Sequence, residues 1–129
     1  MRRDSMTRLR ARCRAAALAS LVIVVSCRAR PRDESGAVSV DNGRALIDAN
    51  GCGACHAISG MADADGTIGP PLSGLARRSY IAGLLPNTRD NLAAWIRTPQ
   101  AFKPGVPMPN LGLSANEATD IAAYLDSRY

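Results

Sequence analysis

The chain has 129 residues, enough for one ordinary domain, and a formal net charge of +5. This charge is unevenly placed, because six arginines face one acid before Cys27, whereas from Arg28 onward ten basic residues match ten acidic ones. The sequence has no basic patch with interleaved aromatic residues, so nucleic-acid binding is not expected.

Residues 1–27 have the pattern of an export signal. The arginine-rich stretch 1–14 precedes an apolar run, "AAALASLVIVVS", at residues 15–26. This run is shorter than the roughly twenty residues that cross a bilayer comfortably. It ends in "VVSC", which resembles a bacterial lipobox in which Cys27 is lipidated and becomes the first mature residue. An ordinary signal with a cysteine near its end, or an uncleaved anchor, is the alternative interpretation.

The segment 28–39 is polar and rich in Pro, Gly and Ser, which predicts a flexible tether. The folded domain is therefore expected at 40–129. It contains one Phe, one Trp and three Tyr, a small supply of large apolar side chains. A domain of this size usually needs a disulfide, a metal or a cofactor to complete its core.

The first predicted helix covers 39–51, where Ser39 or Asp41 can cap the start and Asn50-Gly51 end it. The next stretch, 57–87, is rich in Gly and Pro and is expected to be mostly loop.

A second helix is predicted at 87–99, beginning at a Thr88 cap and ending before Pro99. Its apolar residues share one face by their spacing: Leu92, Trp95 and Ile96. A third helix, 114–129, opens with the capping-box pair Ser114 and Glu117. Its expected buried positions are Ala118, Ile121, Ala122 and Leu125. Strand-like alternation persists nowhere, so these patterns predict a small all-α domain.

The motif "GCGACH" lies between the first predicted helix and the loop. It contains Cys52, Cys55 and His56, and His56 is the single histidine of the sequence. A redox dithiol would need a βαβ setting, and a zinc site would need further Cys or His ligands after His56. A disulfide across two residues closes almost no loop. C-x-x-C-H instead suits haem c, in which both thiols form thioethers with the ring and the histidine ligates the iron.

A haem iron with His56 on one side needs a sixth ligand or an open site. Met108 in "KPGVPMPN" is the candidate, because Pro107 and Pro109 stiffen the loop around it. Met61 follows His56 too closely to reach the opposite face and is interpreted as loop packing. Lys103 is a remote alternative, and Met108 as an ordinary loop methionine is another.

In order along the chain, the motifs G…CxxCH…GPPLSG…W…P…PGxxM…YL resemble the class I cytochromes c over about 41–127. The resemblance implies a small all-α cytochrome c fold, with three main helices plus loops wrapped around one covalently bound haem. It also implies that Gly43 lets the first and last helices cross closely, with Tyr124 as its partner. The carbonyl of Pro70 would accept a hydrogen bond from the imidazole of His56.

Further residues are implied to contact the haem. Leu72 and Trp95 match positions that pack against the ring, and Arg78 matches an arginine near the propionates, for which Tyr80 is a weaker candidate. Each has an ordinary alternative: Trp95 as core only, Arg77 and Arg78 as a solvated pair, and Pro70 as a residue that only shapes a loop.

Two segments, "ARRSYIAGLLPN" and "VPMPNLGLS", resemble the cytochrome c domain of the copper-binding subunit of bacterial haem-copper oxidases. We expect a monomeric one-electron carrier rather than an enzyme. The signal pattern and Cys27 further predict that it is exported and held by lipid at the outer face of the cytoplasmic membrane. Its expected partners are a cytochrome oxidase and an upstream electron donor. The alternatives are a fixed haem subunit of an oxidase complex, and a haem enzyme or gas sensor with an open sixth site.

Overall fold

The computed structural model describes residues 37–128. The predicted export signal 1–27 with Cys27, and most of the predicted tether, lie outside the described residues. No helix among residues 37–128 has the length and apolar character needed to span a membrane.

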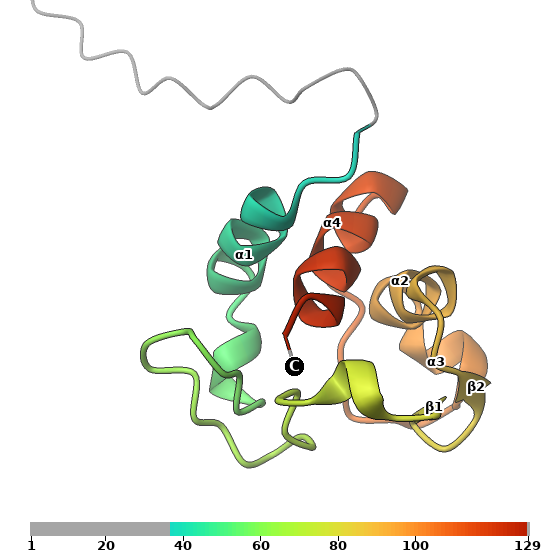
Figure 1. Ribbon diagram of the computed structural model, residues 1–129. Coiled ribbons are helices and arrows are strands. Elements are labelled where there is room, and N and C mark those ends of the chain that lie inside the picture. The colour runs from blue at the N-terminus through green and yellow to red at the C-terminus, as the bar shows by residue number, and fades with distance from the viewer. Residues whose placement is uncertain (1–36, 129) are drawn as a thin grey trace, which may run out of the picture. The chain divides into compact units, whose positions relative to one another are not determined.

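The described chain is mainly helical, with four α-helices and little strand. Figure 1 shows α1 and α4 side by side, with α2 and α3 on the other side of α4. The α-helices are α1 (Val40–Ala49), α2 (Arg89–Arg97), α3 (Pro99–Phe102) and α4 (Ala115–Asp126). Two short 3₁₀ turns cover Cys52–Ala54 and Leu75–Arg77, and two strands, β1 (Tyr80–Ile81) and β2 (Leu85–Pro86), pair antiparallel with Ile81 opposite Leu85.

The predicted helix starts are confirmed by their caps. The Ser39 hydroxyl accepts a hydrogen bond from the backbone N–H of Asn42, and Thr88 caps α2 in the same way. Ser114 and Glu117 form both bonds of a capping box at the start of α4. At its other end, α1 ends at Asn50, and Gly51 takes a left-handed conformation with φ of 64°.

The structure contains one more α-helix than the three that the sequence predicts. Thr98 leaves the helical conformation after α2, and Pro99 then occupies the first turn of α3, where a missing N–H costs nothing. The proline therefore ends one helix and begins another. The β1–β2 hairpin was not predicted either, because two-residue strands are too short to show an alternating pattern.

The core lies where α4 packs against α1 on one side and α2 on the other. Its buried apolar side chains come from all three helices and from the loop between α1 and α2, and the four predicted positions on α4 are among them. They include Ile47, Ile58, Leu75, Leu92, Trp95, Ile96, Ala118, Ile121, Ala122, Tyr124 and Leu125.

The crossing of α1 and α4 depends on Gly43. A Cβ atom at this position would overlap the backbone carbonyl of Asp120, so the two helices approach more closely than any side chain allows. The predicted close crossing is confirmed. The atoms nearest to that Cβ position belong to the backbone of Asp120 and Ile121, one turn before the implied partner Tyr124.

Asp120 also holds the start of α1. Its buried carboxylate accepts hydrogen bonds from the backbone N–H of Ser39 at 2.8 Å and from the Asn42 side-chain amide at 2.7 Å. A negative charge at the amino end of a helix is favourable because the helix dipole is positive there. The angle between α1 and α4 is therefore set by two neighbouring contacts, the close approach at Gly43 and the hydrogen bonds of Asp120.

We expect Gly43→Ala to destabilise the folded domain. Helix propensity alone would favour alanine by about 1 kcal/mol. The overlap with the Asp120 carbonyl opposes this, and overpacking of a tight contact costs about 1–3 kcal/mol. Chemical unfolding of the variant beside Ala45→Gly, a change on the exposed face of the same helix, measures the balance. A Gly43→Ala protein as stable as the parent would show that the crossing has room to spare.

Candidate haem site

The two cysteines of the C-x-x-C-H motif lie on one short helical turn. Gly51 ends α1 and turns the chain directly into the 3₁₀ segment Cys52–Ala54. The Cys52 carbonyl accepts hydrogen bonds from the backbone N–H of both Cys55, at 3.2 Å, and His56, at 3.0 Å. Both cysteines are free thiols and partly buried. The turn therefore presents two available thiols and an imidazole from one compact piece of backbone.

The surroundings of Cys52 keep its thiol protonated. Burial raises the pKa of Cys52 above its ordinary value, a hydrogen bond from backbone lowers it in part, and the neighbouring Cys55 raises it further. Redox-active C-x-x-C pairs depend on the thiolate, which a raised pKa disfavours. Formation of a thioether consumes the thiol and removes the titrating group.

His56 is oriented by a hydrogen bond from its ring. Its Nδ1 lies 2.7 Å from the carbonyl oxygen of Pro70. A carbonyl can only accept, so Nδ1 carries the proton and the lone pair of the ring is on Nε2. This is the tautomer that a metal-ligating histidine needs, and a carbonyl partner on the other nitrogen orients the ring and increases its basicity.

Gly69 is a site residue that the sequence analysis did not single out. A Cβ atom there would overlap the ring of His56 itself. The backbone N–H of Gly69 also donates to the Cys55 carbonyl at 2.7 Å, which ties the segment before Pro70 to the motif. In the sequence Gly69 is visible only as the glycine of "GPPL". The fold shows that the imidazole of His56 packs against it.

The loop after the motif folds back onto it. The N–H of Gly66 donates to the Gly53 carbonyl at 3.0 Å, and that of Leu72 donates to the Ala57 carbonyl at 2.8 Å. A Cβ atom at Gly66 would also overlap the peptide that joins Ala54 and Cys55. Glycine at this position lets the backbone cover the motif at contact distance.

Apolar residues from distant parts of the chain pack against one core. Cys52, Leu72 and Met108 are all partly buried and pack against the same buried core. Trp95 belongs to that core, being 8% exposed, and its ring centroid lies 6.4 Å from that of Phe102 on α3. The fold thus brings Met108 and Leu72 to the core that supports the motif.

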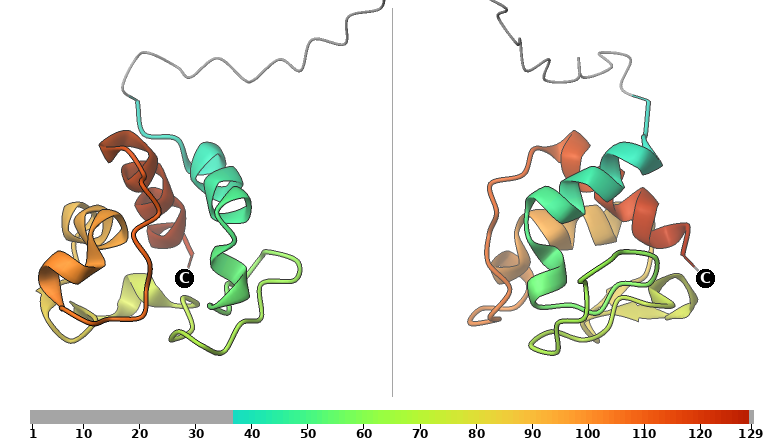
Figure 2. Two further views of the ribbon diagram at one scale, coloured as in Figure 1. Left: turned by 180° about the vertical axis from the view of Figure 1, so that it is seen from behind. Right: turned by 90° about the vertical axis from the view of Figure 1, so that its left-hand side faces the viewer.

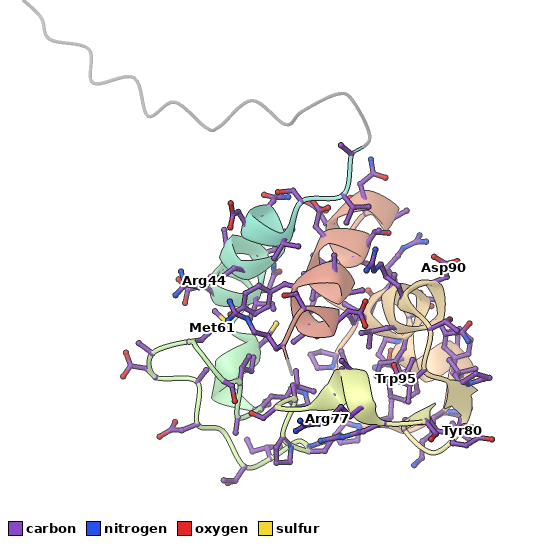
Figure 3. All side chains as sticks on the ribbon, viewed as in Figure 1. Arg44, Met61, Arg77, Tyr80, Asp90 and Trp95 are labelled. Atoms are coloured by element: carbon purple, nitrogen blue, oxygen red, sulfur yellow. The ribbon has the colours of Figure 1, made fainter. Side chains whose placement is uncertain are left out.

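The candidates for propionate contacts are exposed. Arg78 donates from Nη2 to the Pro71 carbonyl at 2.6 Å, and the Asn87 side-chain amide donates to the Arg78 carbonyl at 2.8 Å. Arg77 lies in the neighbouring 3₁₀ turn, and Tyr80 on β1 has 59% of its surface exposed (Figure 3). No ion pair to a carboxylate is present at Arg77 or Arg78 among residues 37–128.

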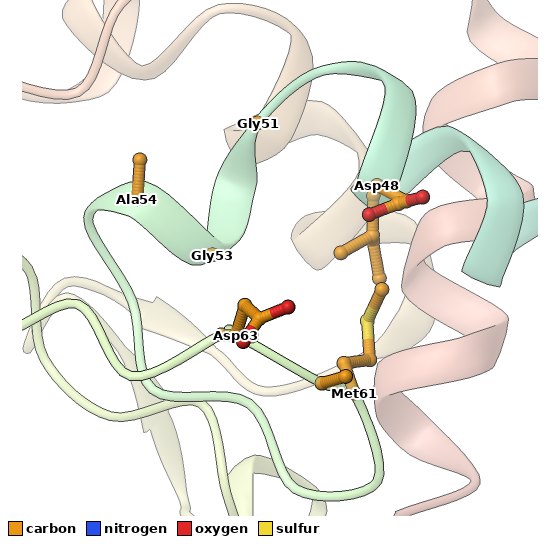
Figure 4. A pocket seen from close by; sticks show the side chains of 9 residues that line it. Asp48, Gly51, Gly53, Ala54, Met61 and Asp63 are labelled. Atoms are coloured by element: carbon orange, nitrogen blue, oxygen red, sulfur yellow. The ribbon is translucent and has the colours of Figure 1, made fainter.

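A hollow of about 180 Å³ lies between the end of α1, the motif turn and the loop at 61–64. Its lining includes Gly51, Gly53, Met61 and Asp63, as Figure 4 shows, but neither Cys55, His56 nor Met108. Met61 packs from there against the core, in agreement with its interpretation as loop packing.

The donor set fits a covalent haem better than a bare metal ion. In the part of the chain that the structure describes, no group of three or more Cys, His, Asp or Glu side chains is placed to hold a metal. Two free thiols, one imidazole with Nε2 available and an apolar surface with a thioether are what haem c requires.

Comparison with known proteins agrees with this geometry. Residues 40–128 match the family described as Cytochrome c. The chain is also 39% identical over 88 residues to a protein named cytochrome c oxidase subunit 2 from Alkalihalophilus pseudofirmus. That match covers 67% of this chain and 25% of the relative, so the chain spans about a quarter of the relative's length.

We expect Gly69→Ala to displace the His56 ring from the Pro70 carbonyl. The added methyl group needs the space that the imidazole occupies, and the strain should lower the unfolding free energy by about 1–3 kcal/mol. NMR of the haem-loaded protein should show faster solvent exchange of the Nδ1 proton. Ile68→Ala, at a neighbour that is 76% exposed, is the control. An unchanged Nδ1 proton signal in Gly69→Ala would mean that the ring does not depend on Gly69.

Proposed function

The chain belongs to the cytochrome c family, and from that premise we propose that it is a one-electron carrier of a respiratory chain. The family binds haem c through the cysteines of the motif, which are Cys52 and Cys55 in this chain. We further propose that His56 and Met108 would hold the haem iron. The observation that carries the proposal is the hydrogen bond from His56 Nδ1 to the Pro70 carbonyl, which leaves Nε2 free within the C-x-x-C-H turn.

Haem, when bound, supplies an iron that exchanges a single electron between its ferrous and ferric states. The residues of the chain hold the geometry around it. Pro70 keeps the His56 ring in one orientation, and the Met108 thioether comes from a loop between two prolines. Met and His together raise the reduction potential, and fixed ligands keep rearrangement between the two states small.

If His56 and Met108 both hold the iron, a substrate would find no open position there, so we propose a carrier and not an enzyme. Leu72 and Trp95 are proposed to contact the ring, because Leu72 and Cys52 pack against the same core and Trp95 is part of it. Arg78 and Tyr80 are proposed to bind the propionates. Among residues 37–128, the Arg78 guanidinium is bonded to the Pro71 carbonyl through one nitrogen, and its other N–H groups can donate to a carboxylate.

The partners and location are also proposed. The match to an oxidase subunit favours an electron acceptor of the cytochrome oxidase class, with an upstream donor, on the outer face of the cytoplasmic membrane. Residues 28–129 carry balanced charge, so docking is proposed to be weak, transient and mainly apolar, by a monomer. A lipid on Cys27 would confine this exported carrier to the membrane and raise its effective concentration near its partners.

A second candidate function is a fixed haem subunit of an oxidase complex. It is favoured by the same relative, in which the matching region is a quarter of a larger protein named as an oxidase subunit. The chemistry would be identical, and only the permanence of the contact differs.

The first test is the optical spectrum of the oxidised protein and of Met108→Leu. A methionine-ligated ferric haem shows a weak long-wavelength charge-transfer band from sulfur to iron. We expect this band in the parent and in Met61→Leu, and its loss in Met108→Leu together with carbon monoxide binding by the reduced variant. A parent protein without the band that binds carbon monoxide would instead favour an enzyme or gas sensor with an open sixth site.

The second test is fractionation of membranes from cells that make the full chain. We expect the parent in the membrane fraction and Cys27→Ser in the soluble fraction, because the substitution removes the acylated thiol. Membrane retention of Cys27→Ser would contradict the lipid anchor. Recovery of the parent without other subunits after mild detergent extraction supports a free carrier, whereas stable co-purification with an oxidase supports the fixed-subunit alternative.

A further inference from the structure

The loop that carries Met108 is held by very few hydrogen bonds. Pro107 and Pro109 have no N–H to donate, and the described residues 107–111 make two hydrogen bonds. One is local, from the Gly112 N–H to the Asn110 side chain. The other joins the loop to a different element: the Gln100 side-chain amide donates to the Met108 carbonyl.

Gln100 is presented by a well-anchored helix. It is the second residue of α3, directly after Pro99, which is among the most deeply buried residues of the described chain. The N–H of Lys103 donates to the Pro99 carbonyl at 2.9 Å, and Phe102 packs beside Trp95. Figure 2 shows the chain leaving α3 and passing along the domain before it reaches α4. The side chain of Gln100 therefore extends from an anchored helix, and its amide connects that helix to the loop that carries Met108.

The hydrogen bond to the Met108 carbonyl requires a side chain that can donate. A backbone carbonyl accepts, so the side chain at position 100 must offer an N–H. The remaining hold on the loop is apolar packing of Val106, Met108 and Leu113 against the core, and apolar contacts have no directional preference. The hydrogen bond is therefore the contact that sets the orientation of the Met108 backbone, and through it the position of the thioether.

We propose that Gln100 is a positioning residue for the Met108 thioether, acting through the Met108 carbonyl. This inference rests on the proposed ligation by Met108. Gln100 itself touches neither the iron nor the ring in this role. Its function is to keep the loop closed, so that the sulfur rarely leaves its place and external ligands are kept out.

The test measures how fast added imidazole displaces the Met108 sulfur in the oxidised, haem-loaded protein. Displacement requires the sulfur to leave, so its rate reports loop opening. Gln100→Leu removes the donor, and Gln100→Glu keeps the shape but offers only an acceptor at neutral pH. We expect displacement in both to be about five- to tenfold faster, the factor given by the loss of one ordinary hydrogen bond.

Two further variants separate the hydrogen bond from a general structural effect. Gln100→Arg restores an N–H donor of sufficient reach and should return the rate toward that of the parent. Asn116→Leu removes an exposed amide on α4 and should leave the rate unchanged. Because Gln100 is exposed, the thermal unfolding midpoint should change little in any of the four.

The outcomes are distinct from those of the functional proposal. A parent-like displacement rate in both Gln100→Leu and Gln100→Glu would overturn the role of Gln100 while Met108 ligation stands. A rate in Gln100→Arg as fast as in Gln100→Leu would also overturn it, because a restored donor would then have no effect. A parent protein without the charge-transfer band overturns Met108 ligation itself, and the role of Gln100 with it.

Discussion

The arrangement of the domain depends on the contact between α1 and α4 at Gly43. Backbone meets backbone there, and Asp120 adds two hydrogen bonds to the first residues of α1 from the same turn of α4. Since α1 passes through Gly51 directly into the Cys52 turn, a change in this crossing would move both cysteines. The amino end of α1 is held by polar contacts and its carboxyl end carries the chemistry, so a remote packing constraint places the site.

On the side of His56, the site is built from loop backbone that closes on the motif. Hydrogen bonds return from Gly66, Gly69 and Leu72 to carbonyls between Gly53 and Ala57. These contacts need residues without a Cβ atom at Gly66 and Gly69, because the backbone lies against a peptide in one case and an imidazole in the other. Cys52, at the start of the same turn, is partly buried against the core, and this burial raises the pKa of its thiol.

The side of Met108 follows a different principle. Few backbone donors are available between two prolines, so the loop relies on apolar packing and on one donor from α3. The two sides of the proposed haem site thus differ in how firmly they are held. The imidazole is backed by several backbone hydrogen bonds. Among the described residues, the Met108 backbone accepts one hydrogen bond, from the side chain of Gln100.

Local patterns predict three of the four described α-helices and the chemistry of the motif, because both depend on residues close together in the chain. Ser39, Thr88 and Ser114 cap helices through bonds to residues three positions away, and C-x-x-C-H carries its donors within one turn. The extra helix α3 and the β1–β2 hairpin escaped prediction because each is too short to show a period. The contacts of Gly69 and Gln100 depend on the tertiary structure, since a glycine against an imidazole and an amide reaching a carbonyl eight residues away require particular folds of the loops. The local sequence identifies the reactive groups, which are the two thiols and the imidazole of the motif. The packing of distant segments decides how these groups are oriented.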